Sequence, residues 1–235
     1  NFSETDDTDK RNTYAGGLAF VFQPGKRHKL TLNTSVDALT GPGVTATTTW
    51  IYKGRETLHE ILKARNDYTK QENTKYTTGI GYQFAITEQQ SIAANADWIH
   101  VDGLSRNQQP NAFYSPDGKL LREDDYPAEN KKTINILSST ADYRLKNSRG
   151  GELLAGVKAA KGVLDLTRSN RFTYQESNLE GYLQYARQWK RLQASAGLRV
   201  EYMQTVGTLK SYQDGTVMEE NKNCHTRFFP NLSVM

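Results

Sequence analysis

The feature that most constrains the fold of this chain is the alternation of its connections between predicted strands. About ten or eleven stretches have the pattern of β-strands. Tight connections are predicted at 24–28, 53–57, 87–90, 146–151 and 189–191. The connections at the opposite strand ends, several of them long, are predicted at 39–43, 69–73, 103–131, 166–175 and 207–227. An up-and-down meander places every second connection on the same side, and short turns facing long loops are typical of a transmembrane β-barrel.

The predicted strands alternate apolar and polar residues, which indicates two different faces. The alternation is clear in 30–38, 76–86 and 192–202, looser in 14–22, 44–52, 91–101 and 179–189, and mixed in 132–145 and 152–165. Residues 56–68 also fit a helical period, but we predict a strand there. Several strands exceed the ~5–6 residues usual in globular proteins and match the ~9–11 residues of a tilted membrane strand. The sequence therefore predicts an all-β antiparallel meander that forms part of a transmembrane β-barrel.

Composition excludes some classes of protein. The mean hydropathy is −0.74 and the longest clear apolar run is Leu18 to Phe22, which excludes a helical membrane protein. A barrel strand exposes only alternate residues to lipid, so low hydropathy is compatible with a barrel. The net charge of +4 is scattered, and we expect no nucleic-acid binding. The single Cys224 excludes an intrachain disulfide.

Turn signals and aromatic residues refine this prediction. Asp117-Gly118 and Asp214-Gly215 lie inside the two longest connections. Asp-Gly is a strong hairpin signal, so we expect these loops to protrude as β-hairpins, with Cys224 in the outer loop 207–227. Aromatic residues near strand ends suit either an interfacial girdle or ordinary cross-strand packing. These residues are Trp50, Tyr52, Tyr185, Trp189 and Tyr202.

The last third of the chain resembles a known family. Residues 172–182 follow the pattern F-x-Y-x-E-x-x-x-x-x-Y, a G-L-R-x-E stretch covers 197–201, and Phe229-Pro230-Asn231 follows a polar loop. This order resembles the barrel of TonB-dependent outer-membrane receptors, especially the outer-membrane β-barrel group common in Bacteroidetes. The diagnostic part covers 172–235, and the rest is similar only in strand and loop style.

The resemblance implies import of a scarce nutrient, such as a ferric chelate, cobalamin, a glycan or a peptide, across the outer membrane. Such receptors have a barrel of about 22 strands around an N-terminal plug that is energised through TonB. Residues 1–235 show no plug, TonB-contact segment or closing strand. We therefore expect a single barrel segment, a fragment of a larger receptor. Its expected partners are outer-membrane lipid, its own plug domain, TonB and an extracellular nutrient ligand.

Two groups of residues are candidates for contact with that ligand. Arg199 and Glu201 share the polar face of one strand and are expected to face the lumen; the alternative is a cross-strand ionic ladder of structural value. Four loop aromatics are expected to contact ligand, unless they pack the protruding hairpins together. They are Phe113, Tyr114, Tyr126 and Tyr212.

The sequence predicts no catalytic, cofactor-binding or metal-binding residue, and we expect no enzyme. Asp6, Asp7 and Asp9 lack EF-hand spacing, His59-Glu60 lacks the second histidine of a zincin, and no G-x-S-x-G occurs. Two alternatives remain open at this point. One is a soluble all-β carbohydrate-binding module. The other is an outer-membrane barrel enzyme, for which His225 is the one histidine that can be placed at the rim.

Overall fold

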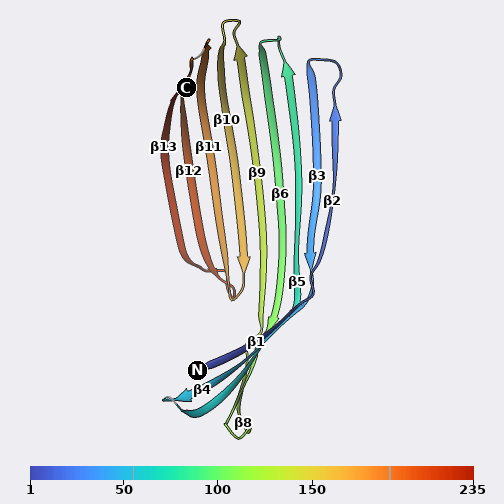
Figure 1. Cartoon of the computed structure of the whole chain (residues 1–235), viewed down its shortest axis with the longest axis vertical. Helices are drawn as coiled ribbons and strands as arrows, with labels where there is room; N and C mark the ends of the chain where they lie inside the picture. Colours follow the sequence, from blue (N-terminus) through green and yellow to red (C-terminus); the bar gives the residue numbers. More distant parts are fainter. Residues whose placement is uncertain (55, 191) are drawn as a thin grey trace.

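The computed structural model describes residues 1–54, 56–190 and 192–235, which form one antiparallel sheet of thirteen strands (Figure 1). The predicted connections 53–57 and 189–191 include Arg55 and Arg191, which lie outside the described residues. In chain order the strands are β1 (Phe2–Asp9), β2 (Asn12–Phe22), β3 (His28–Thr40), β4 (Gly43–Lys53), β5 (Thr57–Ala85), β6 (Gln90–Gln108), β7 (Pro110–Tyr114), β8 (Leu120–Asp125), β9 (Ala128–Lys146), β10 (Gly151–Thr167), β11 (Asn170–Trp189), β12 (Leu192–Ser211) and β13 (Val217–Val234). The prediction of an all-β antiparallel meander is confirmed.

Two of the predicted chain reversals, at 39–43 and 69–73, were wrong. β5 is one continuous strand of 29 residues. It pairs with β3 from Glu72 to Phe84 and with β4 from Thr57 to Tyr68, so β3 and β4 lie in line beside it. Residues 69–73 contain no Gly or Pro, and strands on both sides can supply hydrogen bonds, so this polar stretch stays extended. At 41–42 Pro42 interrupts the ladder because it has no N–H, yet the chain does not turn back.

This correction changes which end of the sheet some connections occupy. β1 and β2 likewise lie in line against β4 and β3. Without the two reversals, β4 ends and β5 begins at the end predicted for the long loops, and the 53–57 connection was therefore assigned to the wrong end. The connections predicted at 24–28, 87–90, 146–151 and 189–191 still join strand ends at the other side.

The predicted long loops are mostly strand. β7 and β8 form a hairpin within 103–131, and the Asp-Gly pairs occupy the turns 115–119 and 212–216, so the expected protruding hairpins are confirmed. The connection 166–175 was predicted too long, because β10 and β11 are joined only by residues 168–169. Cys224 lies in β13, paired with Gln204, and not in a loop. The polar residues of these segments keep pairing because each hairpin arm supplies the other's hydrogen-bonding groups.

The register places similar residues of nine strands, β2, β3, β5, β6 and β9 to β13, on the same face. One row of paired residues crosses nine strands on what we term the apolar face, through Phe20, Leu32, Ile80, Ala96, Ser139, Ala159, Leu179, Tyr202 and Thr226. The adjacent row lies on the opposite side, termed the polar face, through Val21, Thr31, Gly81, Asn95, Thr140, Lys158, Glu180, Glu201 and Arg227. The alternation predicted for single strands is thus continuous across the sheet.

The large apolar side chains of the apolar face form a band, here called the apolar band, which crosses these rows diagonally. On β2 the apolar residues extend as far as Tyr14, but the row of Tyr14 contains Asp165 on β10 and Glu220 on β13. On β11 and β12 the band instead extends the other way, to Trp189 and Leu192. A band that shifts from strand to strand is what a level membrane requires when the strands are tilted, as they are in barrels.

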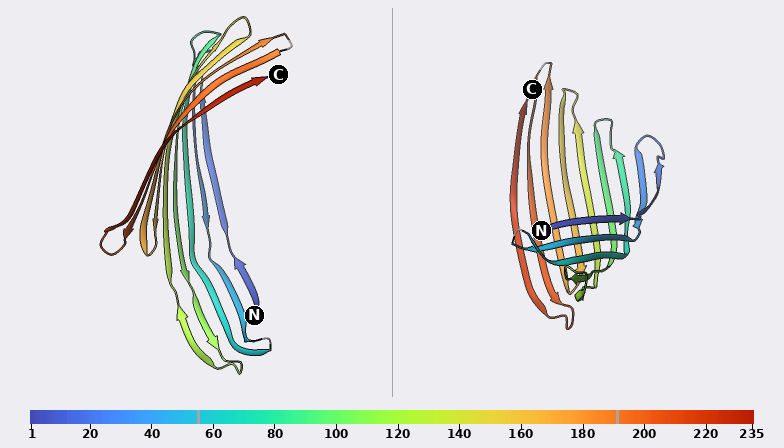
Figure 2. Two further views of the ribbon diagram at one scale, coloured as in Figure 1. Left: turned by 90° about the vertical axis from the view of Figure 1, so that its left-hand side faces the viewer. Right: turned by 60° about the horizontal axis from the view of Figure 1, so that its bottom comes forward.

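The sheet is a single curved layer without a hydrophobic core among the described residues (Figure 2). Large apolar side chains stay exposed, for example Leu18 at 78% and Leu232 at 79%. β13 and the β1–β2 edge are not paired with each other within residues 1–54, 56–190 and 192–235. Because a soluble protein rarely exposes so continuous an apolar surface, this face needs a lipid environment.

The predicted girdle aromatics fall into two groups. Tyr185, Trp189 and Tyr202 lie exposed on the apolar face. Trp50 instead contacts Phe2 on the neighbouring β1, with ring centroids 5.3 Å apart. For Trp50 the geometry favours cross-strand packing, because β4 lies beyond the band in line with β3.

Candidate functional site

Arg199 and Glu201 belong to a charged cluster on the polar face. Glu180, only 9% exposed, is its centre, with its carboxylate 3.2 Å from Lys158 Nζ and 3.8 Å from an Arg199 guanidinium nitrogen. Arg199 is also 3.9 Å from Glu201, and the Asn178 amide donates to both Glu180 and Glu201. The cluster links three neighbouring strands. Its groups are largely occupied by one another, which gives the cluster structural value.

Two of the predicted loop aromatics pack within the β7–β8 hairpin. The guanidinium of Arg122 lies 3.7 Å from the centre of the Phe113 ring, and Lys63 Nζ lies 5.1 Å from that of Tyr114. Arg122 also pairs with Glu60 on β5. These contacts fasten the hairpin to β5, where β7 already pairs with residues 61–64.

The other two predicted aromatics, Tyr126 and Tyr212, are brought together by the fold. They are 56% and 67% exposed, and both line one hollow of about 530 Å³, here called the outer hollow. Tyr126 lies between β8 and β9, and Tyr212 lies in the β12–β13 turn. The remaining lining residues are Gln109, Asp125, Pro127, Ala128, Glu129, Lys131, Thr167, Arg168 and Ser169.

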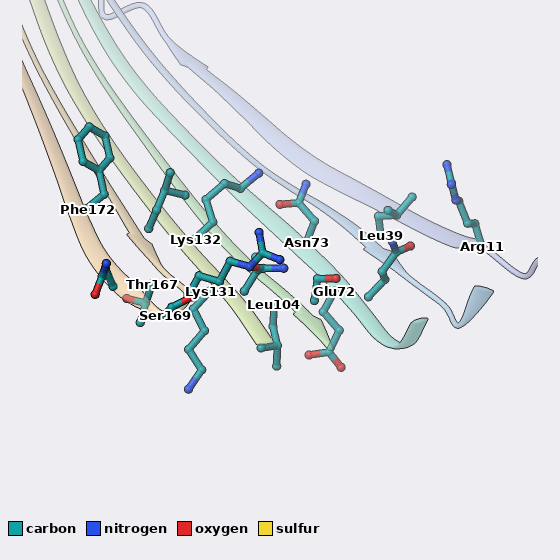
Figure 3. Close-up of a pocket in the computed structure, with 17 residues that line it drawn as sticks. Arg11, Leu39, Glu72, Asn73, Leu104, Lys131, Lys132, Thr167, Ser169 and Phe172 are labelled. Carbon is teal, nitrogen blue, oxygen red and sulfur yellow. The ribbon is translucent and has the colours of Figure 1, made fainter. Parts of the chain in front are cut away.

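A larger cavity of about 760 Å³, here called the inner cavity, lies beside it. Figure 3 shows Phe172, Lys132 and Asn73 directed to one side of the sheet, and Lys131, Leu104 and Glu72 directed to the other. Asn73, Lys132 and Phe172 share the polar face, because Asn73 pairs with Gly103, Gly103 with Lys132, and Leu166 pairs with both Lys132 and Phe172. The full lining is Arg11, Leu39, Gln71, Glu72, Asn73, Gly103, Leu104, Ser105, Asn130, Lys131, Lys132, Leu166, Thr167, Arg168, Ser169, Asn170 and Phe172.

The two spaces share a wall and differ in charge. Lys131, Thr167, Arg168 and Ser169 line both. Lys131 is 3.0 Å from Glu129, whereas Lys132 and Arg168 form no ion pair with any described residue. The inner cavity therefore carries cations without carboxylate partners, beside the apolar Phe172.

Sequence reasoning missed the inner cavity. Phe172 was noticed only as part of the family pattern, and Lys132 and Arg168 carried no local signal. They meet because β9, β10 and β11 are neighbours in the sheet.

Two carboxylates at the end of the sheet that carries the outer hollow and the inner cavity have lowered pKa values. Hydrogen bonds from Arg106, 2.6 Å away, and then from Lys131 lower the pKa of Glu129. Thr216, through its hydroxyl and its backbone N–H, and then Ser211 lower the pKa of Asp214 to about 2. Both groups therefore stay charged at neutral pH, and Asp214 fastens the β12–β13 turn.

Within the part of the chain that the structure describes, no three His, Cys, Asp or Glu side chains gather into a group that could hold a metal ion. Over the same ranges, no helix is long and apolar enough to cross a membrane.

The open antiparallel sheet, its tilted apolar band and its polar opposite face define an outer-membrane β-barrel protein. The model of the outer membrane protein beta-barrel family matches residues 84–235, more than half of the chain. The chain belongs to that family, and it is located in the outer membrane with its apolar face toward lipid.

One solved structure supports this fold. The open form of the ferric-catecholate import receptor Fiu from E. coli K12 is similar with a TM-score of 0.54 and 9% identity, covering 99% of this chain and 51% of that one. The chain thus spans about half the length of that receptor. The outer membrane protease OmpT from Escherichia coli is similar only at a TM-score of 0.31 with 8% identity, over 99% of this chain and 94% of that one. No curated protein matches the sequence.

Proposed function

We propose that this chain is a barrel segment of a TonB-dependent receptor, of the Bacteroidetes type, that imports a nutrient ligand across the outer membrane. The ligand is a ferric chelate, a glycan or a similar molecule. The observation that carries this proposal is the inner cavity. It opens on the polar face, which would be the lumen of a closed barrel, and lies at the end of the sheet where the hairpins protrude.

The fold supports the same proposal. The sheet superposes on half of a receptor that imports ferric catecholate, so the remaining strands and the plug would come from the rest of a longer protein. In that arrangement the cluster of Lys158, Glu180, Arg199 and Glu201 lies on the lumen wall. It would hold the wall rigid beside the plug, while Tyr126 and Tyr212 would meet ligand from outside.

Uptake by whole cells tests this function. Cells that carry the full-length receptor, cells deleted for it, and cells that carry it but lack TonB would be supplied with radiolabelled ferric catecholate and with a labelled oligosaccharide. We expect at least one of the two to accumulate only when both receptor and TonB are present. Equal accumulation in all three strains for both compounds would contradict the proposal.

A further inference from the structure

The β10–β11 turn is shorter than the two connections that flank it at the same end of the sheet. Thr167 pairs with Lys131 on one side and with Arg171 on the other, and only residues 168–169 lie between the end of β10 and the start of β11. β9 continues past Lys131 to Ala128, and its chain leads through Tyr126 to the β7–β8 hairpin. On the other side the longer turn 212–216 follows Ser211, which pairs with Asn170. The two flanking connections therefore extend beyond this turn and carry Tyr126 and Tyr212.

The outer hollow and the inner cavity meet at this turn from opposite faces. Lys131 and Thr167 form one pair of the register on the side of the apolar face, beyond the apolar band, whereas Lys132 and Leu166 form the next pair and belong to the polar face. Arg168 and Ser169 line both spaces, because they form the edge around which the two faces join. A molecule in the outer hollow can thus reach the inner cavity by crossing only this edge.

Charge changes across the edge. In the outer hollow the cations Lys131 and Arg168 face two carboxylates, Asp125 and Glu129. Both Lys132 and Arg168 line the inner cavity. Figure 3 shows Glu72, a carboxylate of the same lining, directed to the side of the sheet opposite to Lys132. The cation density therefore rises from outside to inside, in the direction that attracts an anion.

Apolar side chains line both the outer hollow and the inner cavity, which we term the two stations. Tyr126 and Tyr212 present aromatic rings in the outer hollow, and Phe172 and Leu166 present apolar surface in the inner cavity. Rings beside cations suit a ligand that combines negative charge with a flat apolar part, since stacking and ion pairing then act together.

We propose that the β10–β11 turn is a notch through which an anionic ligand with a flat apolar part passes from the outer hollow to the inner cavity. Arg168 contacts the ligand at both stations, and Lys132 holds it at the second. The proposal rests on the proposed function for its direction of transport. Its two-station binding and charge selectivity can be measured without uptake.

Two tryptophan reporters in the purified full-length receptor test this order of events. Tyr212→Trp reports on the outer hollow and Phe172→Trp on the inner cavity. Ferric tris-catecholate, an anionic complex that absorbs light and quenches nearby tryptophan, is mixed rapidly with each variant. We expect quenching of Tyr212→Trp to precede quenching of Phe172→Trp. An uncharged ferric tris-hydroxamate should quench Phe172→Trp at least about tenfold more weakly.

A lysine substitution with a matched control completes the test. Lys132→Gln should weaken the quenching of Phe172→Trp about tenfold and leave that of Tyr212→Trp unchanged. Lys75→Gln, on the same face but outside both spaces, should change neither. Simultaneous quenching of both reporters, equal binding of the uncharged complex, or no effect of Lys132→Gln would overturn the proposal. If stepwise binding is seen but cells accumulate no ligand, the proposed function fails and this inference stands.

Discussion

At the scale of single residues, Glu180 is the side chain on which the polar face depends most. It is nearly buried and receives Lys158, Arg199 and the amide of Asn178 at once. Glu180→Ala leaves those cations without their shared carboxylate, and we expect a loss of about 1–3 kcal/mol in the free energy of unfolding. Urea unfolding of the full-length receptor in detergent, followed by tryptophan fluorescence, measures this loss.

A matched exposed ion pair serves as the control. Lys70 and Glu72 are 3.2 Å apart, with side chains 40% and 46% exposed. Glu72→Ala should cost only about 0–1 kcal/mol, because water already solvates both charges. If the two substitutions cost the same, burial of Glu180 has no energetic consequence.

At the scale of the strand, two adjacent residues of β11 lie on the two different faces of the sheet. Leu183 lies in the apolar band, opposite Leu198 and Ala155, and Gln184 lies on the polar face. Leu183→Lys should destabilise the receptor in a bilayer by about 2–4 kcal/mol, because a charge then meets hydrocarbon. Gln184→Lys should be tolerated. Unfolding titrations in lipid vesicles distinguish them, and equal costs would contradict the assignment of faces.

At the scale of the whole molecule, the fold predicts which end of the sheet faces the outside of the cell. In a Cys224→Ser background, Asp117→Cys at the tip of the β7–β8 hairpin should react with a membrane-impermeant maleimide on intact cells. Arg149→Cys in the β9–β10 turn at the opposite end should react only after lysis. The reverse labelling pattern would place the protruding hairpins inside and refute the orientation.

Much of this architecture could be predicted from residues alone. The period of two in segments such as 76–86 and 192–202 fixed their faces, since side chains of a strand alternate whatever its partners are. For the same reason Arg199 and Glu201 were correctly placed on one polar face, and Asp-Gly pairs marked two turns. These features depend on neighbours in sequence.

Other features depended on partners far away in the chain. Residues 69–73 look like a polar loop, but β3, β4 and β6 supply hydrogen bonds on both sides, so β5 bends at this point without turning back. Because the chain does not turn back there, the 53–57 connection lies at the end of the sheet that was predicted for the long loops. Glu180 could not be singled out from its own strand, because its burial arises from Lys158 and Arg199 on the two neighbours.

The sequence by itself determined the class of fold and the two chemical faces, because alternation and turn residues act locally. The tertiary structure alone decided which strands continue, which turn at the outer end of the sheet is shortest, and that Tyr126 and Tyr212 line one hollow while Lys132 and Phe172 line one cavity. Those placements follow from register, and register is set by hydrogen bonds between segments that are distant along the chain.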